Sequence, residues 1–477
     1  MSGYESWGRF PRATPRAVVP IRWRDEPPSL ADLPGPLLPY ARGRSYGDSC
    51  LNDGGTVLDV NGLARFIAFD ADRGLLRAEA GVGFDAILNL IVPRGWFLPV
   101  TPGTKFVSIG GAIANDVHGK NHHRAGTFGC HVTQLELLRS DGTRLVCSPT
   151  ANAELFQATI GGLGLTGVIL WAEIALKPIP GPQIELRASR FGRLEDFFAL
   201  SEAADADDEY TAGWIDGMSR GRRLGRGVFL GGNHARGDGT WRGAHPSRLR
   251  LPMDVPEWVL NPLSIRVFNE VQYAVLGRKS ARAFAGYESF FYPLDVVHNW
   301  NRAYGKRGFL QYQCVVPFDD GLAVVREILD RIAASRSAYF VVGKVFGSIR
   351  SPGMLSFPRR GVTLAVDIPN RGPEIFALLD AIDALVIEAR GAVYPAKDAR
   401  MSPRSFEAFY PQWAAFARHV DPAFSSSFWR RVTAGLGASD GVPAKAQATA
   451  PSAPASVAGA GGPSAATAAA GALGGGA

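Results

Sequence analysis

The segment from Pro99 to His123 sets the strongest limit on how this chain can fold. It contains the pair Gly110-Gly111 among small residues that include Ala112 and Ala114. Because glycine has no side chain, another group can approach such a backbone closely. The segment therefore predicts a place where the backbone lies against a flat aromatic ring or a pyrophosphate.

Two further glycine-rich segments flank this one. Residues 41–48 (Ala-Arg-Gly-Arg-Ser-Tyr-Gly-Asp) combine converging backbone amides with Arg42 and Arg44. This combination favours a phosphate cradle, although a basic surface turn has the same composition. Residues 162–167 match Gly-x-Gly-x-x-Gly, but a helical stretch precedes them and a strand follows. A nicotinamide-dinucleotide fingerprint needs the opposite order, so a Rossmann-type site is disfavoured.

The periodicity of apolar residues predicts an α+β fold. Short strands begin near Thr56, Leu75 and Val168, and helical spacing begins at Phe84 and Leu322. At 477 residues the chain exceeds the usual size of one core, so we expect two domains, or one interrupted by another. We assign a first domain to residues 5–180, a second domain with a sheet covered by helices to 183–390, a segment returning to the first domain to 391–435, and a disordered Ala/Gly/Pro-rich tail to 438–477.

Composition narrows the class of protein. Hydrophobic residues make up 46% of the chain and charged residues 20%, as in globular proteins. No stretch reaches the roughly 18 apolar residues of a membrane-spanning helix. The amino terminus lacks the pattern of a secretory signal, so we expect a cytoplasmic chain. The net charge of +7 is spread along the sequence, which disfavours nucleic-acid binding but leaves room for a basic face toward lipids or phosphate.

Cysteine and histidine spacing gives little support for a metal. The four cysteines form no Cys-x-x-Cys pair, which argues against a zinc ribbon and a disulfide framework. His118, His122 and His123 are spaced as on one helix face, but Gly119 interrupts them and no acidic or Cys partner follows at ligand spacing. We therefore expect no metal site, and predict that these histidines contact a ligand or make hydrogen bonds.

The three glycine-rich segments, in this order, resemble the flavin-binding domain of the vanillyl-alcohol oxidase and para-cresol methylhydroxylase (PCMH) superfamily. Over residues 5–430 the chain is most similar to the decaprenylphosphoryl-β-D-ribose 2-oxidase family. The resemblance rests on Gly43-Arg-Ser-Tyr-Gly-Asp48, Pro102-Gly-Thr104, Gly110-Gly-Ala-Ile-Ala114, Asp116-Val-His-Gly-Lys-Asn-His-His123, Ala125-Gly-Thr-Phe-Gly129, Gly164-Leu-Thr-Gly167, Asn301-Arg-Ala-Tyr-Gly305, Phe309-Leu-Gln-Tyr-Gln313, Leu355-Ser-Phe-Pro358 and Tyr394-Pro-Ala-Lys-Asp-Ala-Arg400.

This resemblance implies a two-part PCMH-type FAD-binding domain with an inserted α/β substrate domain built on an antiparallel sheet. It also implies that FAD is bound without a covalent link, because residues 41–48 contain no histidine. The residues that it places at FAD are Gly43, Arg44, Ser45, Tyr46, Gly47, Gly103, Ser108, Gly110, Gly111, Asn115, His118, Val168 and Tyr394.

The same resemblance assigns catalytic roles to Lys397 and His118, with Lys397 accepting the proton of the substrate hydroxyl. It assigns substrate binding to Lys120, Tyr304, Gln311, Gln313 and Lys344. Judged from local pattern alone, Lys397 is a solvated charge, while Gln311, Gln313 and Lys344 are outward-facing strand residues. Several members of the family carry a cysteine where this chain has Ala365, so we infer no thiol chemistry.

The implied reaction is oxidation of the 2-hydroxyl of a polyprenylphosphoryl ribose to a keto sugar by hydride transfer to FAD. A short-chain NAD(P)H-dependent reductase would complete the epimerisation, and quinone or oxygen would accept the electrons. A lipid substrate implies a peripheral position at the inner membrane, with the periplasmic face left open. Two alternatives remain: an FAD-linked sugar, aldonolactone or aromatic-alcohol oxidase of the same fold, and an interaction protein without flavin.

Overall fold

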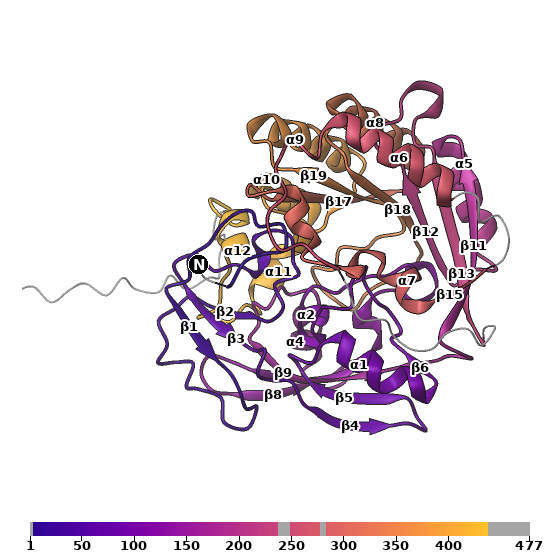
Figure 1. Ribbon diagram of the computed structural model, residues 1–477. Coiled ribbons are helices and arrows are strands. Elements are labelled where there is room, and N and C mark those ends of the chain that lie inside the picture. The colour runs from indigo at the N-terminus through magenta and orange to yellow at the C-terminus, as the bar shows by residue number, and fades with distance from the viewer. Residues whose placement is uncertain (1–2, 237–248, 277–282, 437–477) are drawn as a thin grey trace, which may run out of the picture. The chain divides into compact units, whose positions relative to one another are not determined.

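The computed structural model describes residues 3–236, 249–276 and 283–436. Within these residues the strands form one eight-stranded and one five-stranded sheet, together with three smaller sheets (Figure 1). The smaller sheets are a parallel one of β1 (Ala17–Pro20), β3 (Thr56–Asp59) and β2 (Leu37–Tyr40), and the pairs β6 (Trp96–Phe97) with β10 (Lys177–Pro178) and β14 (Leu249–Arg250) with β16 (Val297–His298).

The five-stranded sheet is antiparallel, and one of the helices that pack on it carries the Gly110-Gly111 pair. Its order is β4 (Phe66–Asp70), β5 (Leu75–Glu79), β9 (Val168–Ala175), β7 (Val132–Leu138) and β8 (Arg144–Cys147). It packs with α1 (Phe84–Ile91), α2 (Ile109–Ala114) and α4 (Ala153–Thr159), and α3 (His122–Ala125) follows α2. Leu76 and Ile174 from the sheet are fully buried against Phe84 and Ile113 in one apolar cluster. Burial of this cluster fixes α2, and with it the Gly110-Gly111 pair, on the sheet.

The eight-stranded sheet is also antiparallel, and its strands come from residues 183–393. Its order is β15 (Ala283–Gly286), β11 (Gln183–Phe191), β13 (Gly227–Ala235), β12 (Tyr210–Ile215), β18 (Phe340–Phe346), β19 (Gly361–Pro369), β17 (Phe309–Pro317) and β20 (Ala392–Val393). Helices α5 (Leu194–Ala204), α8 (Gly321–Ser335) and α9 (Pro373–Glu388) cover one face, while α6 (Pro262–Leu276) and α7 (Tyr287–Phe291) belong to the other side.

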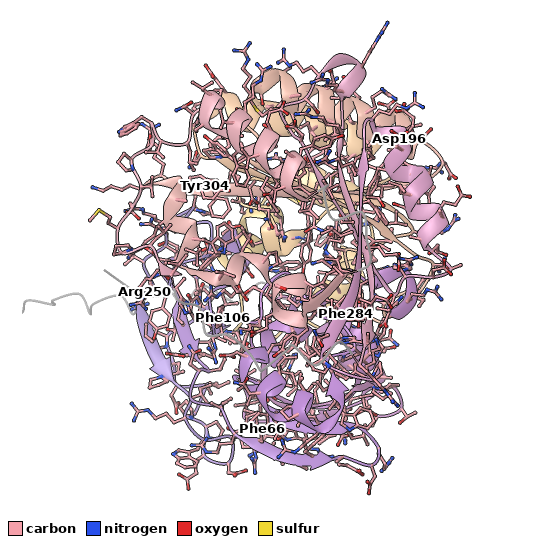
Figure 2. All side chains as sticks on the ribbon, turned by 45° about the vertical axis from the view of Figure 1, so that its right-hand side comes forward. Phe66, Phe106, Asp196, Arg250, Phe284 and Tyr304 are labelled. Carbon is pink, nitrogen blue, oxygen red and sulfur yellow. The ribbon has the colours of Figure 1, made fainter. Side chains whose placement is uncertain are left out.

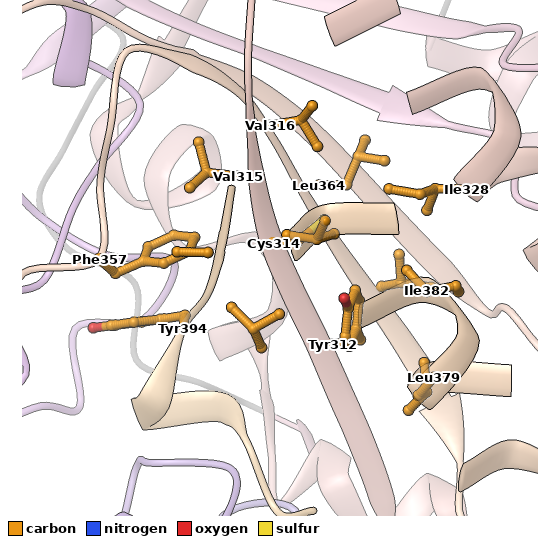
Figure 3. Packing of buried hydrophobic residues seen from close by; sticks show 14 of the residues in the cluster. Tyr312, Cys314, Val315, Val316, Ile328, Phe357, Leu364, Leu379, Ile382 and Tyr394 are labelled. Carbon is orange, nitrogen blue, oxygen red and sulfur yellow. The ribbon is translucent and has the colours of Figure 1, made fainter. Parts of the chain in front are cut away.

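Alternation along β17 divides the residues of this sheet between its two faces. Tyr312 and Cys314 point to α8 and α9, where they pack with Ile328 and Leu379 (Figure 3). Because successive side chains of a strand point to opposite faces, Gln311 and Gln313 point the other way. The face without α8 and α9 therefore carries the polar residues.

The C-terminal segment contacts the first glycine-rich loop. It contains α10 (Pro403–Phe409), α11 (Trp413–Ala417) and α12 (Ser427–Val432). From α12, Arg431 donates hydrogen bonds to the buried carboxylates of Asp48, at 2.6 and 2.9 Å, and of Asp398, at 2.9 Å. These bonds tie the chain around Lys397 to residues 41–48.

The mixed helix and sheet architecture confirms the α+β class. The helices expected at Phe84 and Leu322 and the strands expected at Thr56, Leu75 and Val168 are present. The order around residues 162–167 is helix α4, loop and strand β9, as the sequence indicated. The predicted tail at 438–477 lies outside the described residues.

Candidate active site

A cavity of about 700 Å³ lies between the three glycine-rich segments and the polar face of the eight-stranded sheet. This volume is typical of a cofactor or ligand site. Most of the residues predicted from the sequence line it: Gly43, Arg44, Ser45, Tyr46, Gly103, Ser108, Gly110, Gly111, Asn115, His118, Lys120, Gln311, Gln313, Lys344, Tyr394 and Lys397. Segments that are up to 350 residues apart in sequence thus meet at one cavity.

Three predicted residues do not line the cavity. Gly47 packs so closely on the carbonyl of Asp398 that a Cβ there would lie 1.6 Å from its oxygen. Val168 is fully buried in an apolar cluster, and its neighbours Gly167 and Ile169 face the cavity instead. Tyr304, labelled in Figure 2, stacks on Phe309 at 4.1 Å behind the lining residues. These three residues support the wall rather than form it.

Residues 41–46 of the first glycine-rich loop line the cavity. Gly43 has φ of +58°, and a Cβ there would collide with the Tyr40 hydroxyl, so only glycine fits. In the described part of the chain the amides of residues 43, 44 and 45 donate no backbone hydrogen bond. The Arg44 side chain lies 4.0 Å from the Trp7 ring centroid, and its buried Nε has no partner among the described residues. Consecutive free amides beside a guanidinium form an anion-binding concavity, not a surface turn.

The second segment is held in place by side-chain hydrogen bonds. The Ser108 hydroxyl caps α2 by accepting from the Gly111 amide at 3.2 Å. Asn115 donates to the Gly111 carbonyl at 2.8 Å, and the Tyr394 hydroxyl donates to the Asn115 carbonyl at 2.6 Å. Gly103 has nothing within 4 Å of the place that a Cβ would take. The cavity wall here consists of backbone that a planar group can approach.

A buried carboxylate fixes the run from Asp116 to His123. Asp116 has φ of +41° and accepts hydrogen bonds from the Gly129 amide at 2.9 Å, from Ser351 at 2.5 Å and from Ser356. Burial raises the pKa of its carboxyl, and these hydrogen bonds oppose that change. The strained backbone at Asp116 is thereby locked, and His118 is placed in the cavity wall two residues later.

His118 is held as a neutral imidazole. Gln313 donates to His118 Nε2 at 2.8 Å and to the Thr363 hydroxyl at 3.1 Å, and Thr363 donates to the Cys314 carbonyl at 2.8 Å. Because Thr363 donates elsewhere, the Gln313 amide nitrogen faces both partners, and His118 carries its proton on Nδ1. Burial and then the charge of Lys344 hold the pKa of His118 well below its usual value.

Lys397 lies at the end of a short turn, Pro395–Lys397, beside a buried polar chain. It donates to Gln311 Oε1, and the amide nitrogen of Gln311 donates to Asp367. The Tyr304 hydroxyl donates to the same carboxylate at 3.4 Å. Burial and then the charge of Lys344 lower the pKa of Lys397 from 10.5 to about 7, although Asp367 opposes this. Near neutral pH a large fraction of Lys397 is therefore the free amine, which can take a proton from a substrate hydroxyl.

Asp367 is a site residue that the sequence analysis missed. It lies opposite Gln311 in the β17 and β19 register and is buried in the cavity wall. Burial raises the pKa of its carboxyl, while Gln311 and Lys397 oppose the change. The alternation of Thr363, Ala365 and Asp367 places these residues on one face of β19, but only the pairing with β17 shows that this face meets Gln311.

Lys120 and Lys344 face the same cavity as Lys397. Burial lowers the pKa of Lys344 to about 8. Burial and the charge of Lys344 lower the pKa of Lys120 to about 7, and its Nζ lies 5.5 Å from the ring centroid of Phe290. Lys344, Gln311 and Gln313 therefore line a cavity rather than facing solvent, and Lys397 is not a solvated charge. Three lysine side chains around one cavity suit an anionic ligand.

The other end of the cavity is apolar and was also missed, because isolated aromatic residues carry no sequence signal. Its lining includes Leu186, Ala188, Ala212, Trp214, Leu230, Phe268, Phe290, Phe340 and Val342. The cavity thus has a polar, lysine-rich part and an apolar part. Such a combination suits a ligand with a charged and a hydrocarbon part.

The three histidines have different surroundings. His118 lines the cavity, and its ring and that of His122 pack on Phe346 with centroid distances of 5.0 and 4.5 Å. His123 hydrogen-bonds the Asp208 carbonyl at 3.0 Å. Across residues 3–236, 249–276 and 283–436, no group of three or more His, Cys, Asp or Glu side chains is placed to hold a metal ion. Within the same ranges no helix is long and apolar enough to cross a membrane.

Comparison with known proteins identifies the family. Residues 31–148 match the model of an FAD binding domain. Decaprenylphosphoryl-β-D-ribose oxidase of Mycolicibacterium smegmatis is 35% identical over 405 residues, which cover 82% of this chain and 87% of that protein. The chain belongs to the decaprenylphosphoryl-β-D-ribose oxidase family. It is therefore an FAD-dependent oxidoreductase.

Two other relatives of this chain say less about its substrate. An uncharacterized protein of Streptomyces coelicolor is 34% identical over 374 residues, covering 72% of this chain and 98% of that protein. Cytokinin dehydrogenase 7 of Oryza sativa subsp. japonica is 26% identical over 233 residues, covering 44% of this chain and 43% of that protein. The similarity thus extends across most of the chain for the first two relatives and across less than half for the third.

The cavity fits the FAD that the family requires. Gly103 and Gly111 offer backbone without a side chain to a planar ring, and the free amides of residues 43–45 with the unpartnered Arg44 Nε suit a pyrophosphate. Ser45, Tyr46, Asn115 and Tyr394 complete the polar wall beside them. These residues would hold FAD between the glycine-rich segments and Lys397.

Proposed function

We propose that this chain oxidises the 2-hydroxyl of a polyprenylphosphoryl-β-D-ribose to the 2-keto sugar. The cavity that joins three lysines to an apolar end carries the proposal, because this substrate combines a sugar phosphate with a hydrocarbon chain. The name of the Mycolicibacterium smegmatis relative supports the same substrate. Residues 5–180 and 391–435 would form the flavin domain, and residues 183–390 the substrate domain.

Bound FAD would supply the acceptor for the hydride of the sugar carbon, and the residues of the glycine-rich segments would hold it. We expect it to be held without a covalent bond, since residues 41–48 contain no histidine. The protein's task is to hold the sugar and to take the hydroxyl proton. Lys397 is placed for this, because its lowered pKa keeps a large fraction of its amine free near neutral pH. Gln311 fixes the direction of that amine by accepting from it.

His118 and the remaining lysines position the substrate. As a neutral imidazole held by Gln313, His118 forms part of the cavity wall without adding a positive charge beside Lys344 and Lys397. Lys120 and Lys344 would bind the phosphate, and the Phe290 and Trp214 end would take the first prenyl units. Quinone or oxygen would reoxidise the cofactor, and a short-chain NAD(P)H-dependent reductase would reduce the keto sugar to the epimer.

The test is to add candidate substrates to the purified, FAD-loaded protein without oxygen and to monitor reduction by the visible absorbance of the flavin. Polyprenylphosphoryl ribose should bleach the flavin, whereas free ribose, aldonolactones and aromatic alcohols should not. Bleaching by one of the latter alone would replace the substrate by that of the alternative oxidases. A protein that binds no flavin would contradict the assignment of the cavity.

A Lys397→Met variant tests the proton acceptor. It should bind FAD normally but reduce it at least 100-fold more slowly, because a positioned base contributes roughly two to four powers of ten. Lys306→Met is the matched control, since Lys306 is exposed and lies outside the cavity lining. A Lys397→Met protein that keeps the normal reduction rate would refute this role.

A further inference from the structure

Helix α6 presents an apolar face to solvent. Leu263, Val267, Val271 and Val275 follow one another at intervals of four residues, and their exposed fractions are 71%, 56%, 55% and 54%. At this spacing the four side chains lie along one stripe of the helix. The exposed positions of α9 contrast with this, because they include Glu374, Asp380 and Glu388. An aliphatic stripe in place of charges marks an interaction surface.

The opposite side of α6 covers the cavity. Tyr273 packs against Ala188, Trp214 and Val228 on the cavity face of the eight-stranded sheet. Arg190 anchors the end of the helix through hydrogen bonds to its carbonyl oxygens. One side of the helix therefore packs on the sheet and covers the apolar end of the cavity. The apolar stripe lies on the other side, which faces solvent.

Phe268 connects the cavity to the stripe. It lines the cavity, yet half of its surface is exposed, and on the helix it lies next to Val267 and Val271. Gln272, one turn later, also lines the cavity. Apolar surface thus runs without a break from the interior, past Phe268, onto the outer stripe.

Basic residues border the stripe on the other flank of the helix. Arg266 is exposed. A hydrogen bond from Arg226 lowers the pKa of the Glu270 carboxyl, and the nearby charges of Arg223 and Arg266 lower it further. Glu270 itself is paired with Arg226 at 2.6 Å. Within the described residues Arg266 has no acidic partner at ion-pair distance. The helix therefore combines an apolar face with a positive edge, and exposed Trp258 precedes it.

We propose that the outer stripe of α6 docks on an anionic lipid bilayer, so that the hydrocarbon chain of the substrate passes from the membrane along Phe268 into the cavity. An apolar helix face with an arginine border and a nearby tryptophan is the pattern of interfacial helices. This inference rests on the proposed function, because a polyprenyl substrate resides in a bilayer. A second copy of the chain is the competing occupant.

The test is flotation of the full chain with vesicles of phosphatidylcholine containing phosphatidylglycerol. We expect the protein to float with these vesicles and a Leu263→Ser/Val267→Ser/Val271→Ser variant to bind at least tenfold more weakly. The control is Phe66→Ser/Val146→Ser/Leu322→Ser, which removes three exposed apolar residues outside α6. Phe66 lies at the bottom of the view in Figure 2, and α6 lies in the upper part of Figure 1. Arg266→Glu should weaken binding to anionic vesicles more than to pure phosphatidylcholine.

Three outcomes would overturn the docking proposal. The wild-type protein does not float, or the α6 variant floats as the wild type does, or sedimentation velocity shows that the α6 variant only converts a dimer into a monomer. Flavin reduction by a short-chain polyprenylphosphoryl ribose in detergent separates this proposal from the proposed function. The α6 variant should retain that reduction, and loss of vesicle binding with normal reduction in every protein would leave the oxidase assignment intact.

Discussion

The rate of flavin reduction should rise with pH through about 7, because Lys397 accepts a proton only as the free amine. Burial and the charge of Lys344 lower the pKa of Lys397 from 10.5 to about 7. With that pKa, about a tenth of the amine is free at pH 6 and about nine tenths at pH 8. The reduction rate should therefore increase roughly tenfold over this interval. An ordinary lysine would be free in only about one molecule in three thousand at pH 7.

Lys344→Met tests the electrostatic part of this argument. The substitution removes a like charge, so the pKa of Lys397 rises and the midpoint of the profile moves to higher pH by about one unit. At pH 7 the variant should reduce its flavin about fivefold more slowly than the wild type, and it should recover above pH 9. Lys344→Arg keeps the charge and should keep the midpoint.

Stopped-flow absorbance under anaerobic conditions, from pH 5.5 to 9.5 at saturating substrate, measures these profiles. Saturation matters because Lys344 also faces the proposed phosphate position, and its loss should weaken substrate binding separately. A midpoint in Lys344→Met that stays at the wild-type value, or that moves to lower pH, would refute the reasoning.

Three further substitutions test other parts of the structure. Asp367→Asn removes the carboxylate that raises the pKa of Lys397, so the midpoint of the same profile should move below 7; an upward movement would contradict the coupling. Gly111→Leu places a side chain beside Ser108 in the cavity wall and should abolish the visible absorbance of purified protein, and full flavin content would count against the fit. Arg431→Met leaves two buried carboxylates without their cation and should lower the free energy of unfolding in urea by about 3 kcal/mol, whereas a loss below about 1 kcal/mol would show that the pair is dispensable.

Sequence alone located the glycine-rich wall of the cavity because glycine has a local requirement. Gly43 needs a left-handed conformation, and Gly111 needs an open approach, and both needs are visible as motifs. The side chains on the cavity face of the eight-stranded sheet are harder to predict from sequence. Gln311 looks like a surface residue until its strand is paired with β19, where it meets Asp367. Register between strands 50 residues apart is a tertiary property, so Asp367 could not be found by spacing.

Gly47, Val168 and Tyr304 lie next to the cavity lining for a related reason. The strand at Val168 begins with that side chain pointing into an apolar cluster, so its neighbours Gly167 and Ile169 reach the cavity. Tyr304 belongs to the segment Asn301–Gly305, which resembles the family. Its ring stacks on Phe309, and its hydroxyl donates a hydrogen bond to Asp367. A motif identifies the segment, whereas the direction of each side chain depends on packing.

One face of β17 packs on the helices of the core, and the other face lines the cavity. Tyr312 and Cys314 bind the sheet to its helices, while Gln311 and Gln313, one step along, address the cavity. Exchange of a side chain on the cavity face, such as Trp214 or Phe340 on neighbouring strands, would reshape the apolar end while α8 and α9 keep their packing on the other face. Because Trp214 also packs against Tyr273 of α6, a smaller side chain there would loosen the helix that covers this end of the cavity.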